Sequence, residues 1–461
     1  MHFDIVSNLG ADVKDSGFSI DELIVRMQEL FNRKAFPSLL RQIVEMFDEM
    51  LRLLVMDGKP LPIDCGCGGD RWVLDGTRSR KLRTPIGTVE LPALMRVKCP
   101  YCGRTTVPIL DICGIDAYQS KTAGLEKLVL EKCVQTSYRR VERDMVSSMG
   151  LAIDHSTFHR WVLETDADEI EVPEDALASF PGVGKPRPVQ VFADGTKCKC
   201  VGDDGPGGHG KAVQGDIKVI LGIRESGAVF PVGTWTGHES WREISEELER
   251  RKVTFPEGSV LVCDGEPAIS ESLAKLVNGQ TQRCGWHTNR DLYFEMWHQG
   301  GNIKKCRPFQ DRLKRIMAIE LPKEDFEKVS DEDKEKLRAK TDAAERDLNE
   351  LIADVRKGGY TRAAGYLERA KASLFTYVRR WLLLGLVCPK ASSFIERTMR
   401  ELGRRIKKLA YNWKEEGLNK VTSILLKIFA SNAEWEKYWR ERMDISQKVM
   451  LTFRLEKALC R

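Results

Sequence analysis

The sequence lacks the apolar segments that would carry a chain into or across a membrane. Its first 15 residues, MHFDIVSNLGADVKD, contain no basic stretch followed by an apolar one, so we expect no secretory signal. The longest strongly apolar run, Trp381–Val387, is much shorter than the roughly 20 residues that span a bilayer. We therefore expect an intracellular, cytoplasmic protein without a membrane partner.

A strong net charge is also missing. The 461 residues include 73 Lys and Arg against 68 Asp and Glu, and the resulting +5 does not by itself indicate a nucleic-acid-binding protein. The charge is unevenly spread, because residues 357–461 hold 23 basic and 10 acidic side chains, a net charge of +13, which leaves about −8 for residues 1–356. With 42% apolar residues the chain is too hydrophobic to be disordered as a whole, and its length predicts about two to four folding units.

An amphipathic helix is expected near the start of the chain. Apolar residues recur at steps of three and four within residues 39–54. Ser19 and Glu22 form a capping-box pattern, and Asp57-Gly58 is a stop signal. These signals predict a pair of helices within residues 19–56.

The 13 cysteines do not suggest a disulfide framework, because their number is odd and no secretory signal precedes them. Two close pairs stand out, Cys65-Gly-Cys67 and Cys99-Pro-Tyr-Cys102, with strand-like segments between them. Four thiolates in two tight turns can enclose one tetrahedral Zn²⁺. We predict a zinc-ribbon-like β module at residues 60–112; the alternative is four unrelated buried thiols.

Residues 136–164 read as two short amphipathic helices separated by a turn. Val141 and Met145 lie on the apolar side of the first helix, and Phe158 and Trp161 on that of the second. The pattern resembles a helix-turn-helix, and a bare helical hairpin is the alternative. The candidate base-reading side chains are His155, Thr157, His159 and Arg160, and the candidate phosphate contacts are Arg139, Arg140 and Arg143. His155 and His159 also have the spacing of metal ligands, but no third ligand is near, so polar helix-face histidines are favoured.

Two apolar runs each end in an aspartate followed by glycine. Residues 189–193 lead into Asp194, and residues 260–263 lead into Asp264, as expected of buried strands that deliver a carboxylate at their ends. Neighbouring carboxylates repel unless a cation neutralises them, and Mg²⁺ or Mn²⁺ prefers such oxygen ligands. The pair therefore indicates a metal site suited to phosphoryl transfer. Asp-Gly is also a common hairpin turn, and each dipeptide taken alone favours a turn.

Cys284 and His287, a little downstream, also have the spacing of zinc ligands. No second pair lies close to them in the sequence, so a closed structural zinc site is not supported. A packed pair without a metal is the alternative.

Taken in order, these motifs resemble those of one transposase superfamily. The sequence reads Phe192-Ala-Asp194-Gly195, Gly233-Thr-Trp235-Thr, Glu239-Ser-Trp241, Cys263-Asp264-Gly265 and Cys284-Gly-Trp286-His287 followed by Arg290-Asp291-Leu292. This set resembles the Mutator-like DDE transposases of insertion sequences, and the order of the N-terminal modules is similar to that of related prokaryotic transposases. The resemblance implies a ribonuclease-H-like core in which two Asp on strands and a Glu on a later helix hold two Mg²⁺ (or Mn²⁺) ions. It also implies an all-helical insertion before that Glu, and Cys284 and His287 match a Cys-x-x-His element of the family.

The same resemblance assigns the third carboxylate. The segment Ser392-Ser-Phe-Ile-Glu396-Arg resembles the family's segment with the catalytic Glu, whereas without the family Glu396 would be read as a solvated helix residue. Glu401 lies five residues later, roughly 140° further round a helix, so at most one of the two can face the aspartates. The catalytic, metal-binding set implied is Asp194, Asp264 and Glu396. Basic side chains that would give DNA an approach to the metals are Arg397, Arg400 and Arg404.

The predicted fold class is therefore multidomain α/β. The predicted parts are an N-terminal helical region (1–59), the zinc-ribbon-like module (60–112), a helix-turn-helix-like region with a linker (113–185), the first part of a ribonuclease-H-like core (186–300), a helical insertion (301–375), and the completion of the core with basic C-terminal helices (376–461).

The activity implied is that of a DNA transposase, which cleaves the ends of an element and joins them to target DNA by two-metal phosphoryl transfer. The expected partners are double-stranded DNA, as terminal inverted repeats and as target, and further copies of the chain, as a dimer when two ends are synapsed. In a prokaryote such a protein would be nucleoid-associated. Two alternatives stay open: a non-catalytic zinc-ribbon and helix-turn-helix regulator derived from a transposase, and a structure-selective nuclease of the same fold that cuts DNA without joining it.

Overall fold

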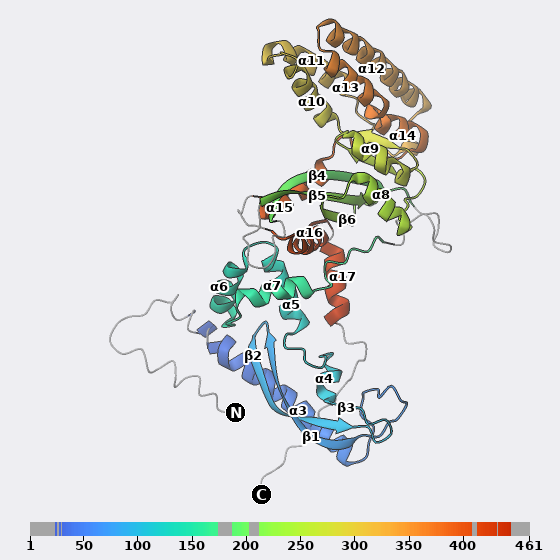
Figure 1. Ribbon diagram of the computed structural model, residues 1–461. Coiled ribbons are helices and arrows are strands. Elements are labelled where there is room, and N and C mark those ends of the chain that lie inside the picture. Colours follow the sequence, from blue (N-terminus) through green and yellow to red (C-terminus); the bar gives the residue numbers. More distant parts are fainter. Residues whose placement is uncertain are drawn as a thin grey trace. The chain divides into compact units, whose positions relative to one another are not determined.

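The computed structural model describes residues 24, 27–28, 30–173, 187–201, 212–407, 413–430 and 432–443 (Figure 1). The predicted capping box at Ser19 and Glu22 lies outside these residues. The described chain is a mixed α/β protein with two sheets, and it divides into two compact units, Met1–Glu164 with Glu436–Arg461 and Thr165–Trp435. A search of the described helices finds none with the length and apolar character needed to cross a membrane.

The first unit contains a long helix packed on a small antiparallel sheet. Its elements are the π-helical turn η1 (Phe31–Ala35), α3 (Phe36–Met56), β1 (Val73–Thr84), β2 (Gly87–Lys98), β3 (Thr105–Thr106) and α4 (Pro108–Ile112). Leu51 of α3 and Val89 of β2 are buried in the same core. Asp48 of α3 accepts a hydrogen bond of 2.8 Å from the backbone N–H of Met95. The helix ends before Gly58, whose φ is +66°, so its predicted stop is confirmed. The strands predicted after it are present as β1 and β2.

Three short helices follow in this unit. They are α5 (Ala123–Cys133), α6 (Tyr138–Met149) and α7 (His155–Glu164). α6 ends at Gly150, with φ +64°, and Asp154 begins α7 by accepting a hydrogen bond of 2.8 Å from the N–H of Ser156. The fully buried side chains between α6 and α7 include Val141, Met145, Phe158 and Val162. The predicted pair of helices is confirmed, and α5 packs against both.

The second unit contains a five-stranded sheet in the order β6-β5-β4-β7-β8. Its strands are β4 (Gln190–Val201), β5 (Ala212–Ile223), β6 (Val229–Gly237), β7 (Val260–Cys263) and β8 (Thr281–Arg283). β5 runs antiparallel to both β4 and β6, whereas β7 runs parallel to β4 and to β8. All four residues of β7 are buried, as expected for a central parallel strand that is covered on both faces.

Helices cover both faces of this sheet (Figure 1). One face carries α8 (Trp241–Arg250), α9 (Pro267–Leu273) and the 3₁₀ turn η3 (Ala274–Val277), and the other carries α15 (Ser393–Ile406) and α16 (Glu415–Ala430). Ala193 of β4 shares a core with Ile244 of α8. Its neighbour Phe192 packs against Phe394 of α15, with ring centroids 5.9 Å apart. Successive residues of β4 therefore point to opposite helical layers, as the pleat of a strand requires.

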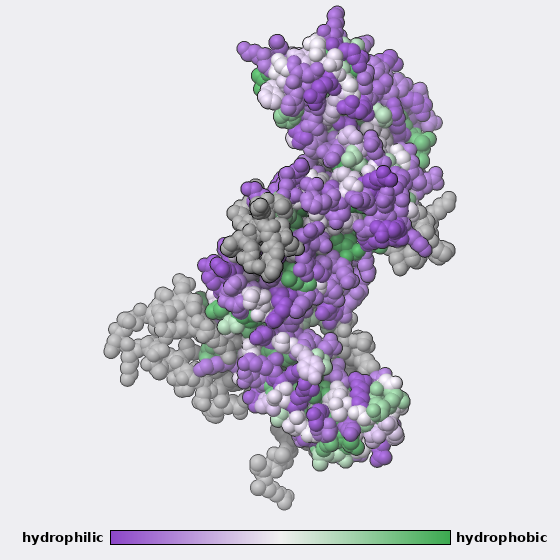
Figure 2. Space-filling model, viewed as in Figure 1, coloured by the Kyte–Doolittle hydropathy of each residue, from purple (hydrophilic) through white to green (hydrophobic). Residues whose placement is uncertain are grey.

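A helical segment separates β8 from α15 along the chain. It comprises α10 (Gly285–Trp297), α11 (Ile303–Ile316), the 3₁₀ turn η4 (Phe326–Lys328), α12 (Asp331–Lys357), α13 (Thr361–Leu374) and α14 (Thr376–Leu384). α12 buries one apolar side, which includes Leu348 and Leu351. Figure 2 shows that the visible surface of these helices is mainly hydrophilic. The charged helical block predicted for this part of the chain is confirmed. The last described helix of the chain is α17 (Asn432–Met443).

Gly222 of β5 leaves space for an aromatic ring on the neighbouring strand β6. It pairs with Phe230 of β6, which is fully buried, and a Cβ atom at Gly222 would lie 2.1 Å from the Phe230 ring. Gly222→Ala should lower the free energy of unfolding by about 1–3 kcal/mol, as overpacking a core does, measured by urea denaturation. Gly403→Ala is the matched control on α15, because nothing lies within 4 Å of a Cβ there, and it should be neutral or slightly stabilising. Equal stabilities of the two variants would contradict this account.

Candidate active site and metal centre

Asp194 and Asp264 lie side by side because their strands pair in register. β4 and β7 are parallel with Phe192 opposite Val262, so the same register, continued by two residues, sets Asp194 beside Asp264. Asp194 lies within β4, and Asp264 directly follows the last residue of β7. The two carboxylates that end the apolar runs of the sequence therefore come from neighbouring strands.

Neither Asp-Gly dipeptide forms a hairpin turn. Asp194 and Gly195 continue β4, and both pair with β5. Asp264 and Gly265 connect β7 to α9. Gly265 has φ +95°, and a Cβ there would lie 2.1 Å from the Arg283 guanidinium, so both the backbone and the available space require glycine. The turn interpretation, which each dipeptide favours when taken alone, is wrong at both positions.

Helix α15 brings a third carboxylate to this pair. Phe394 in its first turn packs on Phe192, which lies on the same face of β4 as Asp194. Glu396 follows two residues later, and its negative charge acts on Asp194. The packing of α15 on β4 is thus what carries Glu396 to the aspartates.

The other glutamate of α15 has a different environment. Glu401 forms an ion pair of 3.2 Å with Arg404 of the same helix. Arg397 and Arg400 are exposed, and the Arg404 side chain is also largely exposed. These arginines follow Glu396 on the same helix.

The pKa of Asp194 is strongly raised by its surroundings. Burial raises the pKa of Asp194 to about 6, and the negative charges of Asp264 and Glu396 act in the same direction. The N–H of Gly195, which donates to Asp194 Oδ1 at 2.7 Å, and the charge of His287 oppose this rise. A divalent cation would neutralise the negative charges that surround Asp194, and oxygen donors of this kind fit Mg²⁺ or Mn²⁺.

Cys284 and His287 adjoin this group. Cys284 precedes α10, and His287 lies in the first turn of that helix. The Ser392 hydroxyl donates to Oε1 of Glu396 at 3.0 Å and lies 3.2 Å from Nδ1 of His287. The N–H of Ser392 donates to Sγ of Cys284 at 3.4 Å. The Cys-x-x-His motif is therefore part of the carboxylate site, and Ser392 is a buried member that the sequence patterns did not reveal.

The thiol and the imidazole affect each other's charge. Burial raises the pKa of Cys284, but hydrogen bonds from His287 and Ser392 outweigh this and lower the pKa to about 7. Burial lowers the pKa of His287, but its hydrogen bond to Cys284 and the charge of that group outweigh this and raise the pKa. Each group thus shifts the pKa of the other in the direction that favours its charged form.

The four cysteines of the first unit form one cluster. The Sγ atoms of Cys65 and Cys102 are 3.4 Å apart, those of Cys65 and Cys67 are 3.4 Å apart, and those of Cys67 and Cys99 are 3.7 Å apart. Four sulfurs bound to Zn²⁺ at about 2.3 Å lie about 3.8 Å from one another, so this spacing fits the ion. Gly66, with φ +72°, lets the flanking thiols turn to one point although only one residue separates them. The cluster can bind a metal such as zinc, and the alternative of four unrelated thiols is wrong.

The candidate DNA-contacting side chains of α6 and α7 have two kinds of environment. Arg139, Arg140, Arg143, His159 and Arg160 are exposed, and Thr157 is half-buried. His155 is tied to α6, because its Nδ1 lies 3.1 Å from Oε2 of Glu142 and 3.6 Å from Asp154. His159 packs edge-on against Tyr138 and does not join the cluster around His155. Contact of these residues with DNA stays a prediction.

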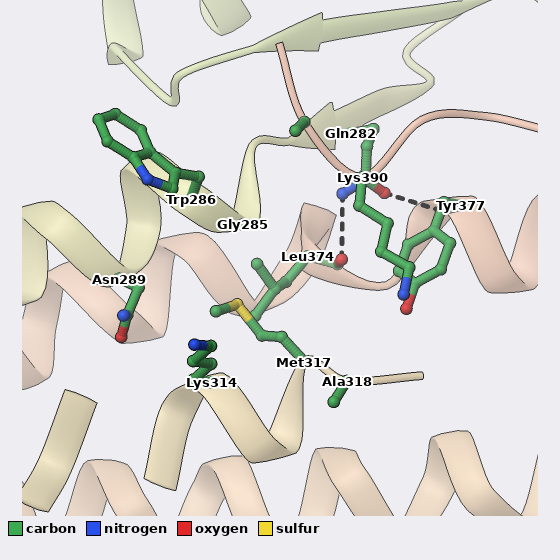
Figure 3. A pocket seen from close by; sticks show the side chains of 11 residues that line it. Gln282, Gly285, Trp286, Asn289, Lys314, Met317, Ala318, Leu374, Tyr377 and Lys390 are labelled. Atoms are coloured by element: carbon green, nitrogen blue, oxygen red, sulfur yellow. Dashed lines mark hydrogen bonds between the residues drawn. The ribbon is translucent and has the colours of Figure 1, made fainter. Parts of the chain in front are cut away.

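A cavity of about 440 Å³ borders α10 (Figure 3). It is lined by Gln282, Gly285, Trp286, Asn289, Lys314, Met317, Ala318, Leu374, Tyr377, Lys390 and Ala391. The ring of Trp286 also packs edge-on against His287, with centroids 4.8 Å apart. The cavity therefore lies next to the Cys-x-x-His motif. No sequence pattern predicted it, because its lining comes from four separate stretches of the chain.

No protein-family model and no curated protein matches the sequence. Among solved structures, the chain is similar to the Drosophila P element transposase strand transfer complex, at 11% sequence identity and a TM-score of 0.25. The similarity covers 69% of this chain and 80% of that chain. A likeness of this size carries no argument about function, which has to come from the residues themselves.

The thiol cluster predicts one zinc ion per chain. Cys99→Ser should reduce bound zinc from about one ion per chain to nearly none and lower the melting temperature of the protein, because a structural zinc site contributes folding free energy. Zinc is measured by mass spectrometry of the purified protein and stability by calorimetry. Cys113→Ser, at an exposed cysteine of the same unit outside the cluster, is the control and should retain zinc. Wild-type protein without zinc would refute the site.

The raised pKa of Asp194 predicts a pH-dependent stability. Between about pH 4 and pH 6 the folded protein holds a proton on Asp194 that the unfolded chain has released, so its contribution to stability falls as the pH rises through this range. In metal-free protein, Asp194→Asn should therefore raise the free energy of unfolding at pH 7 by up to about 3 kcal/mol and have little effect at pH 4. Mg²⁺ should stabilise the wild type more than the variant.

Asp347→Asn, the same substitution at an exposed site on α12, is the control for that measurement and should show no such pH dependence. The account is contradicted when Asp194→Asn destabilises the metal-free protein at pH 7.

Proposed function

We propose that the protein is the DNA transposase of an insertion sequence, which cleaves the ends of the element and joins them to target DNA. The observation that carries this proposal is the convergence of Asp194, Asp264 and Glu396 from two neighbouring parallel strands and one helix. The order of these residues along the chain matches the motif order of the Mutator-like DDE transposases that the sequence resembles.

The arrangement of the second unit supports a ribonuclease-H-like core for this enzyme. Counted from β4, the sheet has the order third, second, first, fourth and fifth strand, and only the second strand is antiparallel to the others. The segment α10–α14 lies between the last strand and the helix with Glu396, where the family places its helical insertion. The six-part division of the chain described above belongs to the same proposal.

Each carboxylate has its own part in the proposed reaction. Two Mg²⁺ ions, when bound, would supply activation of the attacking oxygen and stabilisation of the leaving one during phosphodiester cleavage. Asp194 and Asp264 would hold the ions from the sheet, and Glu396 would close the site from α15. The carboxylates act as ligands and not as nucleophiles, so no covalent intermediate with the protein forms.

The basic side chains supply contacts with the DNA. Arg397, Arg400 and Arg404 would attract the phosphates of the strand next to the carboxylates. The thiol cluster and helices α6 and α7 would recognise the terminal inverted repeats, with exposed arginines on phosphates. We also propose a homodimer in the synapsed state, because two element ends have to be held together.

Alanine at any of the three carboxylates tests this function. Asp194→Ala, Asp264→Ala and Glu396→Ala should each reduce Mg²⁺-dependent strand cleavage by about 10²-fold or more, because each removes a metal ligand. Binding to terminal inverted repeats, measured by gel shift, should stay close to that of the wild type.

Glu401→Ala is the matched control on the same helix, because Glu401 pairs with Arg404 instead of facing the aspartates, and it should cleave DNA normally. A strand-transfer assay on a supercoiled target separates a transposase, which joins the strands, from a nuclease, which only cuts them. Normal cleavage by all three carboxylate variants would mean that the assignment is wrong.

A further inference from the structure

Three buried polar side chains form a connected group next to Glu396: Cys284, His287 and Ser392. We call this group the clamp. We propose that the clamp fixes the position of the Glu396 carboxylate relative to the aspartates, so that its members are positioning residues. The inference rests on the proposed function, in which Glu396 is a metal ligand.

The backbone at the start of α10 joins the two elements that bear the carboxylates. The N–H of Cys284 donates to the carbonyl of Cys263 at 2.8 Å, and Cys263 directly precedes Asp264. The N–H of Gly285 donates to the carbonyl of Lys390 at 2.9 Å, just before α15. The end of β7 and the beginning of α15 are therefore tied to one turn of the chain.

The side chains of the clamp extend this junction to Glu396 itself. Ser392 stands at the N-cap position of α15, but its side chain makes no capping hydrogen bond. An N-cap hydroxyl ordinarily accepts a backbone N–H of the first turn. Here its single proton goes to Oε1 of Glu396, so the oxygen can only accept from Nδ1 of His287. One oxygen of Glu396 is thereby fixed, and the other can bind a cation.

The side chain of Cys284 forms a second contact with the start of α15. Sγ of Cys284 accepts the backbone N–H of Ser392 at 3.4 Å, which is one of the N–H groups at the start of α15. Cys284 is fully buried, and Ser392 is only 2% exposed. Water therefore cannot replace this hydrogen bond, and loss of an acceptor here leaves a buried donor unpaired.

The ligand atoms of Cys284, His287 and Glu396 lie within 4.8 Å of one another, so a metal ion is a second possible occupant of this place. The hydrogen bonds favour the clamp. The Ser392 hydroxyl lies at hydrogen-bond distance from both His287 and Glu396, and its N–H already uses the thiol. These contacts give the polar atoms of Cys284, His287 and Ser392 hydrogen-bond partners without a metal ion.

The affinity of the full-length protein for Mn²⁺, measured without DNA by electron paramagnetic resonance, tests the clamp. Ser392→Ala should weaken Mn²⁺ binding about 10-fold or more, the usual effect of removing a group that orients a metal ligand. The Mn²⁺ concentration for half-maximal DNA cleavage should rise by the same factor, whereas KM for DNA should not change. Ser392→Thr keeps the hydroxyl and should restore both values to near those of the wild type.

His287 gives a second test that does not depend on Ser392. His287→Ala should weaken Mn²⁺ binding as Ser392→Ala does, and His287→Asn, which retains an N–H donor near the position of Nδ1, should recover part of the loss. Ser393→Ala, at the exposed first residue of α15, is the matched control and should bind Mn²⁺ normally. Thermal unfolding without metal verifies that each variant is folded.

Two results would overturn the clamp. The first is that folded Ser392→Ala or His287→Ala binds Mn²⁺ as tightly as the wild type, or that Ser392→Thr does not recover the Mn²⁺ affinity lost in Ser392→Ala. The other is a second zinc ion per chain that Cys284→Ser removes, which would make this place a zinc site. If the wild type binds Mn²⁺ but cuts no DNA, the proposed function fails, while the Mn²⁺ affinities still decide the role of the clamp.

Discussion

The parallel, in-register pairing of β4 with β7 is the constraint on which the candidate active site depends. It forces Asp194, within the central strand β4, and Asp264, just after the end of β7, into adjacent positions. Burial together with the neighbouring charges raises the pKa of Asp194 to about 6. A slip of one residue in this pairing would turn one of the aspartates to the opposite face of the sheet. The apolar side chains of β4 and β7 prevent such a slip, because it would also expose residues that are now buried.

Other side chains of the site change the electrostatic repulsion between Asp194 and Asp264. α15 adds a third negative charge through Glu396, and the same helix bears the exposed Arg397 and Arg400. The buried imidazole of His287 opposes the rise in the pKa of Asp194. In the proposed function, the exposed arginines of α15 would lie where DNA phosphates approach the carboxylates.

The sequence predicted the parts of the site that depend on local order. The apolar runs before Asp194 and Asp264 were sufficient to place each aspartate at a buried strand, and the two cysteine pairs were sufficient to predict their cluster. The backbone conformation of an Asp-Gly dipeptide could not be predicted from its immediate neighbours. Asp194-Gly195 continue a strand, whereas Asp264-Gly265 lead from a strand into a helix. The partition of the chain into compact units likewise depends on contacts between distant segments.

Long-range contacts explain what could not be predicted. Ser392 meets the thiol of Cys284 across 108 residues of sequence, and neither residue has a local pattern that points to the other. The choice between Glu396 and Glu401 needed the packing of Phe394 on Phe192, which fixes the rotation of α15. His155 was expected on the DNA-facing side of its helix, but the position of Glu142 on the preceding helix, not the periodicity of α7, determines its neighbour.

The placement of Glu396 after the whole helical segment α10–α14 has a consequence for how the protein is made. The strands with Asp194 and Asp264 leave the ribosome well before α15 does, and they can bury their apolar faces against α8 and α9 as soon as these have formed. A growing or truncated chain that stops before α15 therefore has two of the carboxylates and lacks the third. The complete three-carboxylate site can therefore first exist when α15 has been made, so synthesis itself delays the moment at which the site can assemble.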